Sequence, residues 1–236
     1  MLNEAIILAG GFGTRLRSVI NDVPKPMAPV NEKPFLDYLL QYLSSYGIKK
    51  IVLSVGFLSE KIIEQYGNQY KGIPISYSIE KEPLGTGGGI RLAMQQCTGE
   101  HVLVLNGDSF FDINLKSFYN HHEEMLADCS LALRKADNAA RYGTIELGDL
   151  DLITAFKEKN GEEKPGTINA GIYLLNRETF LEETPSEKNF SIEKDFFETH
   201  IKQLNLYGFC YDGYFIDIGI PEDFNKAQND FKAFKY

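Results

Sequence analysis

The residues that could do chemistry gather in four short stretches, each beside an apolar run. The first is Gly10-Gly11-Phe12-Gly13-Thr14-Arg15, which follows the apolar residues 5–9, and Lys25 comes soon after between two prolines. Glycines let backbone N–H groups approach an anion, and two nearby cations suit a polyphosphate. Leu16 stands where the dinucleotide fingerprint needs its last glycine, and the Gly-Lys-Ser/Thr of a P-loop is absent. The stretch therefore favours a polyphosphate site over a plain strand-to-helix turn.

A second glycine-rich stretch, Leu84-Gly85-Thr86-Gly87-Gly88-Gly89, opens a predicted helix. Each glycine inside a helix costs about 1 kcal/mol relative to alanine, so helix propensity does not explain the run. We interpret it as a place where the backbone approaches a ligand closely, with a flexible loop as the alternative.

Glu80 lies just before this stretch and carries information about a nucleobase. A carboxylate only accepts hydrogen bonds, so it matches the neighbouring N1–H and N2–H₂ donors of guanine and mismatches the N1 acceptor of adenine. Thymine and uracil present one donor between two carbonyls, which suits a glutamine better. The residue favours GTP; the alternative is a solvated charge beside Lys81 and Glu82.

Two aspartates are candidates for holding a metal ion. Asp108 follows an apolar run and Asn106-Gly107, while Asp217 lies inside the apolar residues 214–220. An unpaired carboxylate in apolar surroundings is costly, and Mg²⁺ prefers hard oxygen ligands together with substrate phosphates. Asp108 taken alone reads as a turn residue. Together, the two predict one Mg²⁺ site between the halves of the chain, with Mn²⁺ as the substitute metal.

The elements that must position these residues follow a regular order. Strands are predicted at residues 5–9, 50–55, 75–80 and 101–105, and helices at 34–43, 59–66, 86–96 and 114–126. The later part is richer in strands, at 129–134, 143–147, 152–157, 168–175 and 206–211, with helices at 192–204 and 221–234. The pattern predicts an α/β, three-layer, doubly wound Rossmann-like mixed sheet with a small antiparallel lobe. Ligands of such sheets lie beyond the carboxyl ends of the strands.

Length and composition limit the function classes. The 236 residues predict a single domain, with halves of about 1–127 and 128–236. A net charge of −9 argues against nucleic acid or an anionic membrane as partner. Neither a signal-peptide layout nor an apolar run of about 18 residues occurs, so we expect a cytoplasmic protein. The three cysteines predict reduced thiols, and His121-His122 predicts surface polar residues rather than a metal site.

Together these stretches resemble the sugar-1-phosphate nucleotidylyltransferases. The motifs that carry the resemblance are residues 8–16 with Pro24-Lys25-Pro26-Met27, residues 84–88, Asn106-Gly107-Asp108, residues 141–144, residues 156–159, Asn169-Ala170-Gly171 and Asp217. They span nearly the whole chain. The resemblance implies a glycosyltransferase-A-like core without the C-terminal β-helix domain of longer members.

The resemblance also implies the reaction and the residue roles. A sugar 1-phosphate oxygen attacks the α-phosphate of a nucleoside triphosphate in line, and pyrophosphate leaves with the help of Mg²⁺. Arg15 and Lys25 would be catalytic, and Asp108 and Asp217 would hold the metal. Implied nucleotide-binding residues are Leu8, Ala9, Gly10, Gly11, Gly13, Thr14, Glu80, Pro83, Gly85, Thr86, Asn106 and Gly107; implied sugar-phosphate-binding residues are Tyr142, Gly143, Glu158, Lys159 and Asn169.

The substrates implied are GTP and a sugar 1-phosphate. Residues 25–30, 78–88 and 214–223 are most similar to family members that use heptose 1-phosphate. Two other substrate pairs stay open as alternatives: mannose 1-phosphate with GTP, and N-acetylmuramate 1-phosphate with UTP. The oligomeric state also stays open between a monomer and a homodimer. Two other classes remain to be weighed. A non-catalytic regulator that binds nucleotide sugars would not need Arg15, Lys25 and both aspartates, so their presence argues against that class. The broken glycine pattern argues against a Rossmann dehydrogenase.

Overall fold

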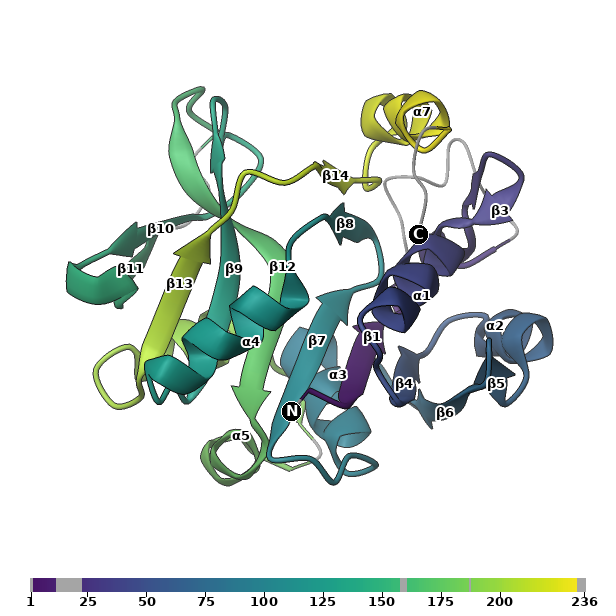
Figure 1. The fold of residues 1–236 in the computed structure, drawn as a ribbon, viewed down its shortest axis with the longest axis horizontal. Helices are drawn as coiled ribbons and strands as arrows, with labels where there is room; N and C mark the ends of the chain where they lie inside the picture. The colour runs from purple at the N-terminus through teal and green to yellow at the C-terminus, as the bar shows by residue number, and fades with distance from the viewer. Residues whose placement is uncertain (1, 12–22, 158–160, 187, 233–236) are drawn as a thin grey trace.

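A central mixed sheet organises the protein in the computed structural model, which describes residues 2–11, 23–157, 161–186 and 188–232 (Figure 1). Four parallel strands form its middle: β1 (Glu4–Leu8) lies between β4 (Lys50–Val55) and β7 (His101–Asn106), and β6 (Ile73–Ile79) pairs with β4. Parallel strands end at one edge, so this arrangement places the residues that follow β1, β6 and β7 close together.

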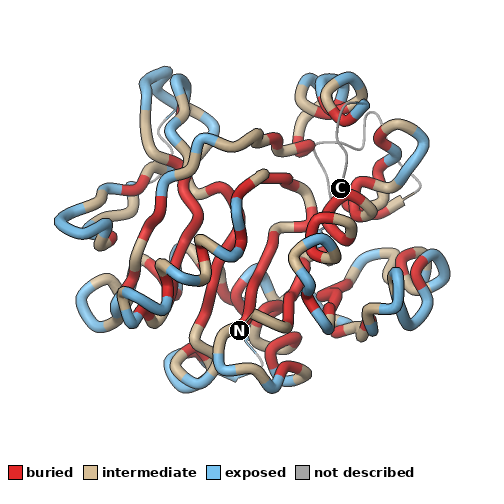
Figure 2. The backbone as a smooth tube through the Cα atoms, viewed as in Figure 1, coloured by how far each residue is buried: buried red, intermediate tan, exposed pale blue. Residues whose placement is uncertain are grey.

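Helices cover both faces of the sheet because its central strands are apolar on both sides. Ile7 and Leu105 pack into a core with α1 (Phe35–Ser45) and α4 (Leu115–Glu124). Their strand neighbours Ile6 and Val104 pack into a second core with α3 (Gly85–Met94) and α5 (Arg177–Glu183). Figure 2 shows the buried stretches along these central strands. The three-layer, doubly wound prediction is confirmed.

The later strands extend the same sheet. β12 (Gly166–Asn176) is antiparallel to β7 on one side and to β9 (Cys129–Ala136) on the other, and β13 (Leu206–Cys210) is parallel to β9. The antiparallel hairpin of β10 (Thr144–Leu147) and β11 (Ile153–Lys157) forms the small lobe. The two predicted halves of the chain therefore share one sheet.

A short antiparallel pair outside the main sheet joins distant parts of the sequence. β8 (Ser109–Phe111) pairs with β14 (Phe215–Asp217), with Asp217 opposite Ser109. The remaining elements are η1 (Lys25–Met27), β2 (Pro29–Val30), β3 (Lys33–Pro34), α2 (Ser59–Tyr66), β5 (Gln69–Tyr70), η2 (Asp149–Asp151), the π-helix η3 (Ile192–Phe197), α6 (Glu198–His200) and α7 (Pro221–Asp230).

Two local predictions differ from the structure, and one helix was missed. The helix α5 was not predicted; it has seven residues, begins at the capping side chain of Asn176 and buries only Phe180. The helix predicted at 192–204 is instead η3 followed by α6 and turns. His122 was expected at the surface and is fully buried, whereas Cys97 and Cys129 are buried thiols and Cys210 is an exposed one.

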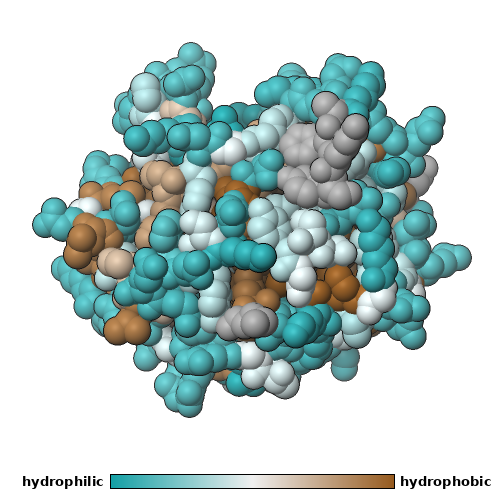
Figure 3. Space-filling view, viewed as in Figure 1, coloured by the Kyte–Doolittle hydropathy of each residue, from teal (hydrophilic) through white to brown (hydrophobic). Residues whose placement is uncertain are grey.

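The surface in Figure 3 is mostly hydrophilic, with small separate hydrophobic areas. Within the described ranges, none of the helices combines the length and the apolar character that a bilayer-crossing segment needs.

Candidate active site

Three cavities meet where the parallel strands end. The first, of about 420 Å³, is lined by Gly10, Gly11, Glu80, Pro83 and Thr86 among others. The second, of about 410 Å³, lies on the side of β10 and β12. Both are within the size range of about 300–1,000 Å³ typical of small-molecule sites.

A smaller cavity of about 160 Å³ joins them. It shares Leu8, Gly11 and Thr86 with the first cavity, and Asn106 and Asp108 with the second. Together the three form one cleft, which we call the two-cavity cleft, with the smaller one as its bridge.

Lys25 lies in the bridge beside the two aspartates. Pro24 and Pro26 flank it in the short 3₁₀ turn η1, which limits the backbone freedom of the lysine. Its ammonium Nζ lies 2.5 Å from Asp108 Oδ2 and 3.6 Å from Asp217 Oδ1. The pairing of β8 with β14 brings the two carboxylates, which are 109 positions apart in sequence, to this one cation.

Burial is the main influence on Asp217. It raises the pKa of the carboxyl, and the negative charge of Asp108 raises it further. The charges of Lys25 and Arg141 and a hydrogen bond from the Gly219 backbone N–H work in the opposite direction. A carboxylate in this position gains from any cation that approaches it.

Glu80 faces the first cavity and also holds the turn after β6. Its Oε2 accepts a hydrogen bond from the Leu84 backbone N–H at 3.0 Å, and its Oε1 accepts one from Ser54 Oγ at 3.3 Å. A Cβ placed on Gly10 would lie 3.0 Å from this Oε1. The absence of a side chain at Gly10 therefore leaves room for the carboxylate of Glu80. Glu80 is thus half-buried with two protein partners, unlike a freely solvated charge.

Two glycines in the first turns of α3, Gly87 and Gly88, have a different physical reason from the one predicted. A Cβ on Gly87 would overlap the ring of Phe190, and one on Gly88 would lie 2.6 Å from the Lys188 carbonyl oxygen. The close approach at these two positions is made by the protein's own segment before η3, not by a ligand. Gly85 lines the first cavity and has a φ of +71°, which favours glycine.

The second cavity contains three of the predicted sugar-phosphate residues, Tyr142, Gly143 and Asn169, together with both aspartates. Other predicted residues differ in position. Ala9 is fully buried beneath the cleft, and its N–H donates to the Ser54 carbonyl. The residues Gly13, Thr14, Arg15, Glu158 and Lys159 lie outside the described residues.

Sequence reasoning missed several of the side chains that line the cleft, Phe57, Arg141 and Glu193 among them. Phe57 borders the first cavity, and Arg141 and Glu193 border the second. Arg141 pairs with Asp223 on α7 at 2.5 Å and lies 3.7 Å from Asp217. The motif at residues 141–144 was the available signal for Arg141, whereas nothing local in the sequence marks Glu193.

The nucleotidyl transferase family model matches residues 4–233. The chain belongs to this family. A nucleotidyltransferase named D-glycero-alpha-D-manno-heptose 1-phosphate guanylyltransferase, from Aneurinibacillus thermoaerophilus, is 48% identical over 231 residues, covering 98% of this chain and 99% of the relative. A second protein of that name, from Campylobacter jejuni, is 46% identical, covering 94% and 96%. The crystal structure of HddC from Yersinia pseudotuberculosis complexed with GMP-PN matches with a TM-score of 0.85 at 35% identity, covering 98% of this chain and all of that one.

Nucleotidyltransferases typically use a divalent metal, and the bridge fits one. Asp108 and Asp217 present hard oxygen ligands to a single point that a cation, the ammonium of Lys25, already approaches. Among the described residues no group of three or more histidine, cysteine or acidic side chains could hold a metal. Two carboxylates suit Mg²⁺, which keeps waters and substrate phosphates as its other ligands.

Proposed function

We propose that this nucleotidyltransferase transfers GMP from GTP to D-glycero-α-D-manno-heptose 1-phosphate, giving GDP-heptose and pyrophosphate. The observation that carries the proposal is the two-cavity cleft, in which Lys25 and Asp108 line the bridge between two ligand-sized spaces and Asp217 approaches Lys25 from the second cavity. The near full-length identity to two heptose 1-phosphate guanylyltransferases supports the choice of substrates.

In this proposal GTP lies with its base in the first cavity and its phosphates along the bridge. The backbone at Gly10 and Gly11 and the start of α3 line that path. The sugar phosphate occupies the second cavity, beside Tyr142, Gly143 and Asn169. The attacking oxygen and the α-phosphate then meet in the bridge, and catalysis is positioning plus charge stabilisation.

Lys25 is the group placed to stabilise negative charge at the reacting phosphate. Its side chain is only 12% exposed, so its ammonium is less screened by water than that of a surface lysine. Asp108 and Asp217 would hold Mg²⁺, which supplies further charge neutralisation on phosphate oxygens when bound. We extend the proposal to Arg15 for the leaving pyrophosphate, Lys159 for the sugar phosphate and Glu158 for sugar hydroxyls, as the family resemblance implies.

Glu80 is proposed to select guanine. Its carboxylate lines the first cavity and is held by Leu84 and Ser54, so it is oriented before the base arrives. The N1–H and N2–H₂ donors of guanine match this acceptor.

GTP and sugar phosphates are cytoplasmic metabolites, so we place the enzyme in the cytoplasm.

Pyrophosphate release tests the proposal. Four nucleoside triphosphates are crossed with heptose, mannose, glucose and N-acetylmuramate 1-phosphates in the presence of Mg²⁺. GTP with heptose 1-phosphate should give the highest kcat/KM. No release with any pair would leave only a binding role for the cleft.

The variant Glu80→Gln tests base selection, with Glu60→Gln on the exposed part of α2 as the matched control. A glutamine oxygen still accepts from the Leu84 N–H, but the charge-assisted contact to guanine is lost. A hydrogen bond to a charged group contributes about 1.5–3 kcal/mol, so kcat/KM with GTP should fall about 10- to 100-fold, while that with UTP should not. A full GTP preference in Glu80→Gln would show that Glu80 does not read the base.

A further inference from the structure

We propose that Glu193 is a positioning residue that couples nucleotide binding in the first cavity to the arrangement of the sugar cavity. The inference rests on the proposed function, in which the two cavities hold the two substrates. Glu193 lies on η3 and lines the second cavity, and it accepts hydrogen bonds from Thr86, which lines the first cavity, and from the buried Tyr173.

On the nucleotide side its partner is Thr86. Thr86 Oγ1 donates to Glu193 Oε2 at 3.1 Å and accepts from the Ile192 backbone N–H at 2.9 Å. Thr86 lines both the first cavity and the bridge, in the first turn of α3. A nucleotide that contacts this turn therefore restricts the position of Glu193.

On the sugar side the partner is Tyr173, which is fully buried on β12. Its hydroxyl donates to Glu193 Oε1 at 3.3 Å and accepts from Asn169 Nδ2 at 2.8 Å. Burial raises the pKa of Tyr173 well above its usual value, so the hydroxyl keeps the proton that it donates. Asn169 Oδ1 accepts from the Gly171 backbone N–H at 3.0 Å, which completes the orientation of this amide. Asn169 thus donates a hydrogen bond to Tyr173, and Tyr173 donates one to the carboxylate of Glu193.

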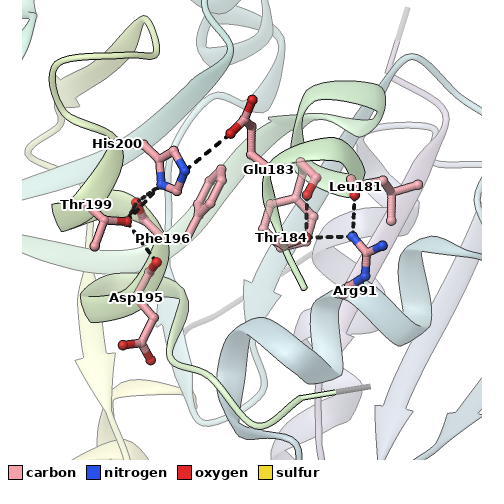
Figure 4. A network of polar contacts seen from close by, with 9 residues as sticks. Arg91, Leu181, Glu183, Thr184, Asp195, Phe196, Thr199 and His200 are labelled. Carbon is pink, nitrogen blue, oxygen red and sulfur yellow. Dashed lines mark hydrogen bonds and ion pairs between the residues drawn. The ribbon is translucent and has the colours of Figure 1, made fainter. Parts of the chain in front are cut away.

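The segment that carries Glu193 is attached firmly to α3. Phe190 and Lys188 pack against Gly87 and Gly88, where no side chain intervenes. A further network, shown in Figure 4, fixes the neighbouring helices: Arg91 on α3 donates to the Leu181 carbonyl and to Thr184 Oγ1, the latter at 2.7 Å.

The same figure shows His200, just beyond η3, 3.5 Å from the carboxylate of Glu183 on α5. Contacts at Thr86, Gly87 and Gly88 thus hold the first turn of α3 directly against η3 and the segment before it. Wide π-helical turns such as η3 are frequent at functional sites.

The coupling predicts a reciprocal effect on the two affinities. The dissociation constant of heptose 1-phosphate is measured by titration calorimetry in Mg²⁺, with and without a saturating α,β-methylene analogue of GTP, which cannot react. In the wild type the analogue should tighten sugar-phosphate binding by about 5-fold or more. In Glu193→Gln and Thr86→Val the ratio should approach one.

Matched variants separate coupling from loss of structure. Thr86→Ser keeps the hydroxyl and Glu182→Gln alters an exposed residue of α5, so both should keep the wild-type ratio. Combining Thr86→Val with Glu193→Gln should remove no more coupling than either change alone, because both break one chain of contacts. A wild-type ratio of one, or an unchanged ratio in Glu193→Gln, would overturn the role of Glu193.

Hydrogen exchange distinguishes this outcome from failure of the proposed substrates. The GTP analogue alone should slow exchange in peptides covering residues 169–173 and 191–197 in the wild type, and less so in Thr86→Val. If the substrate panel shows no heptose transfer but this protection pattern holds, the proposed sugar is wrong and the coupling stands. If GMP transfer to heptose 1-phosphate occurs but the exchange protection is the same in the wild type and in Thr86→Val, the proposed coupling is wrong.

Discussion

Replacing Lys25 by methionine should change the rate and the metal affinity in opposite directions. The ammonium lies 2.5 Å from Asp108 Oδ2 and 3.6 Å from Asp217 Oδ1, in a side chain that is only 12% exposed. Methionine has a similar length and apolar stem but no charge. The substitution therefore leaves two carboxylates facing each other without the cation between them.

The rate effect follows from the loss of a preorganised charge at the reacting phosphate. Removing one such donor typically costs about 10²- to 10³-fold in kcat. The metal effect follows from the loss of a competitor, because the charge-assisted hydrogen bond of Lys25 to Asp108 no longer has to be displaced. Such a bond contributes about 1.5–3 kcal/mol, so Mg²⁺ should bind about 10- to 100-fold more tightly.

Pyrophosphate release gives kcat, and titration with Mn²⁺ followed by electron paramagnetic resonance gives the metal affinity. Lys33→Met, at an exposed position of β3, is the matched control and should change neither quantity. A Lys25→Met protein that keeps the wild-type kcat, or one that folds normally but binds metal more weakly, would refute the role that we assign to the ammonium.

Two further outcomes concern stability. His122 is fully buried, with Nδ1 2.8 Å from Ser130 Oγ and Nε2 2.9 Å from His101 Nδ1. Burial and the charge of His101 lower the pKa of His122 to about 3. An unfolded histidine has a pKa near 6.5, so below about pH 6.5 the unfolded chain binds the extra proton, and the free energy of unfolding should fall by up to about 1.4 kcal/mol per pH unit. Urea unfolding of His122→Gln between pH 4.5 and 7 should lack this contribution, and an equal pH slope in both proteins would contradict it. Separately, Gly87→Ala should lower the free energy of unfolding by about 1–3 kcal/mol through overlap with Phe190, and Phe190→Leu should recover part of that loss; strictly additive effects would show that the two residues do not clash.

Local sequence signals were enough to predict many of the residues that line the cleft and the strands that carry them. The strand predicted at residues 101–105 is β7, with Gly107 and Asp108 directly after it, and Gly10 and Gly11 follow closely after the end of β1. Periodicity identifies a strand, and parallel pairing brings strand ends to one edge. The predicted convergence of Asp108 and Asp217 at one place also agrees with the structure, through the β8–β14 pair. Their role as metal ligands stays a prediction.

Other features depended on contacts between distant residues. The glycines of α3 signalled a close approach, but only the fold shows that Phe190, about a hundred positions later, makes it. His122 looked like half of a polar surface pair until the packing of α4 placed it against His101 and Ser130. Buried polar groups need partners, and the sequence does not reveal which partners the chain supplies.

The sequence by itself determined the family, the alternation of strands and helices, and the residue types needed for phosphate chemistry, because these depend on spacing along the chain and on side-chain chemistry. Only the tertiary structure decided that Lys25 lies between Asp108 and Asp217, and that Glu193 joins Thr86 to Tyr173. These contacts form between residues 20 to 192 positions apart. Their geometry is set by how η1, η3 and the β8–β14 pair pack around one sheet edge, which no local pattern encodes.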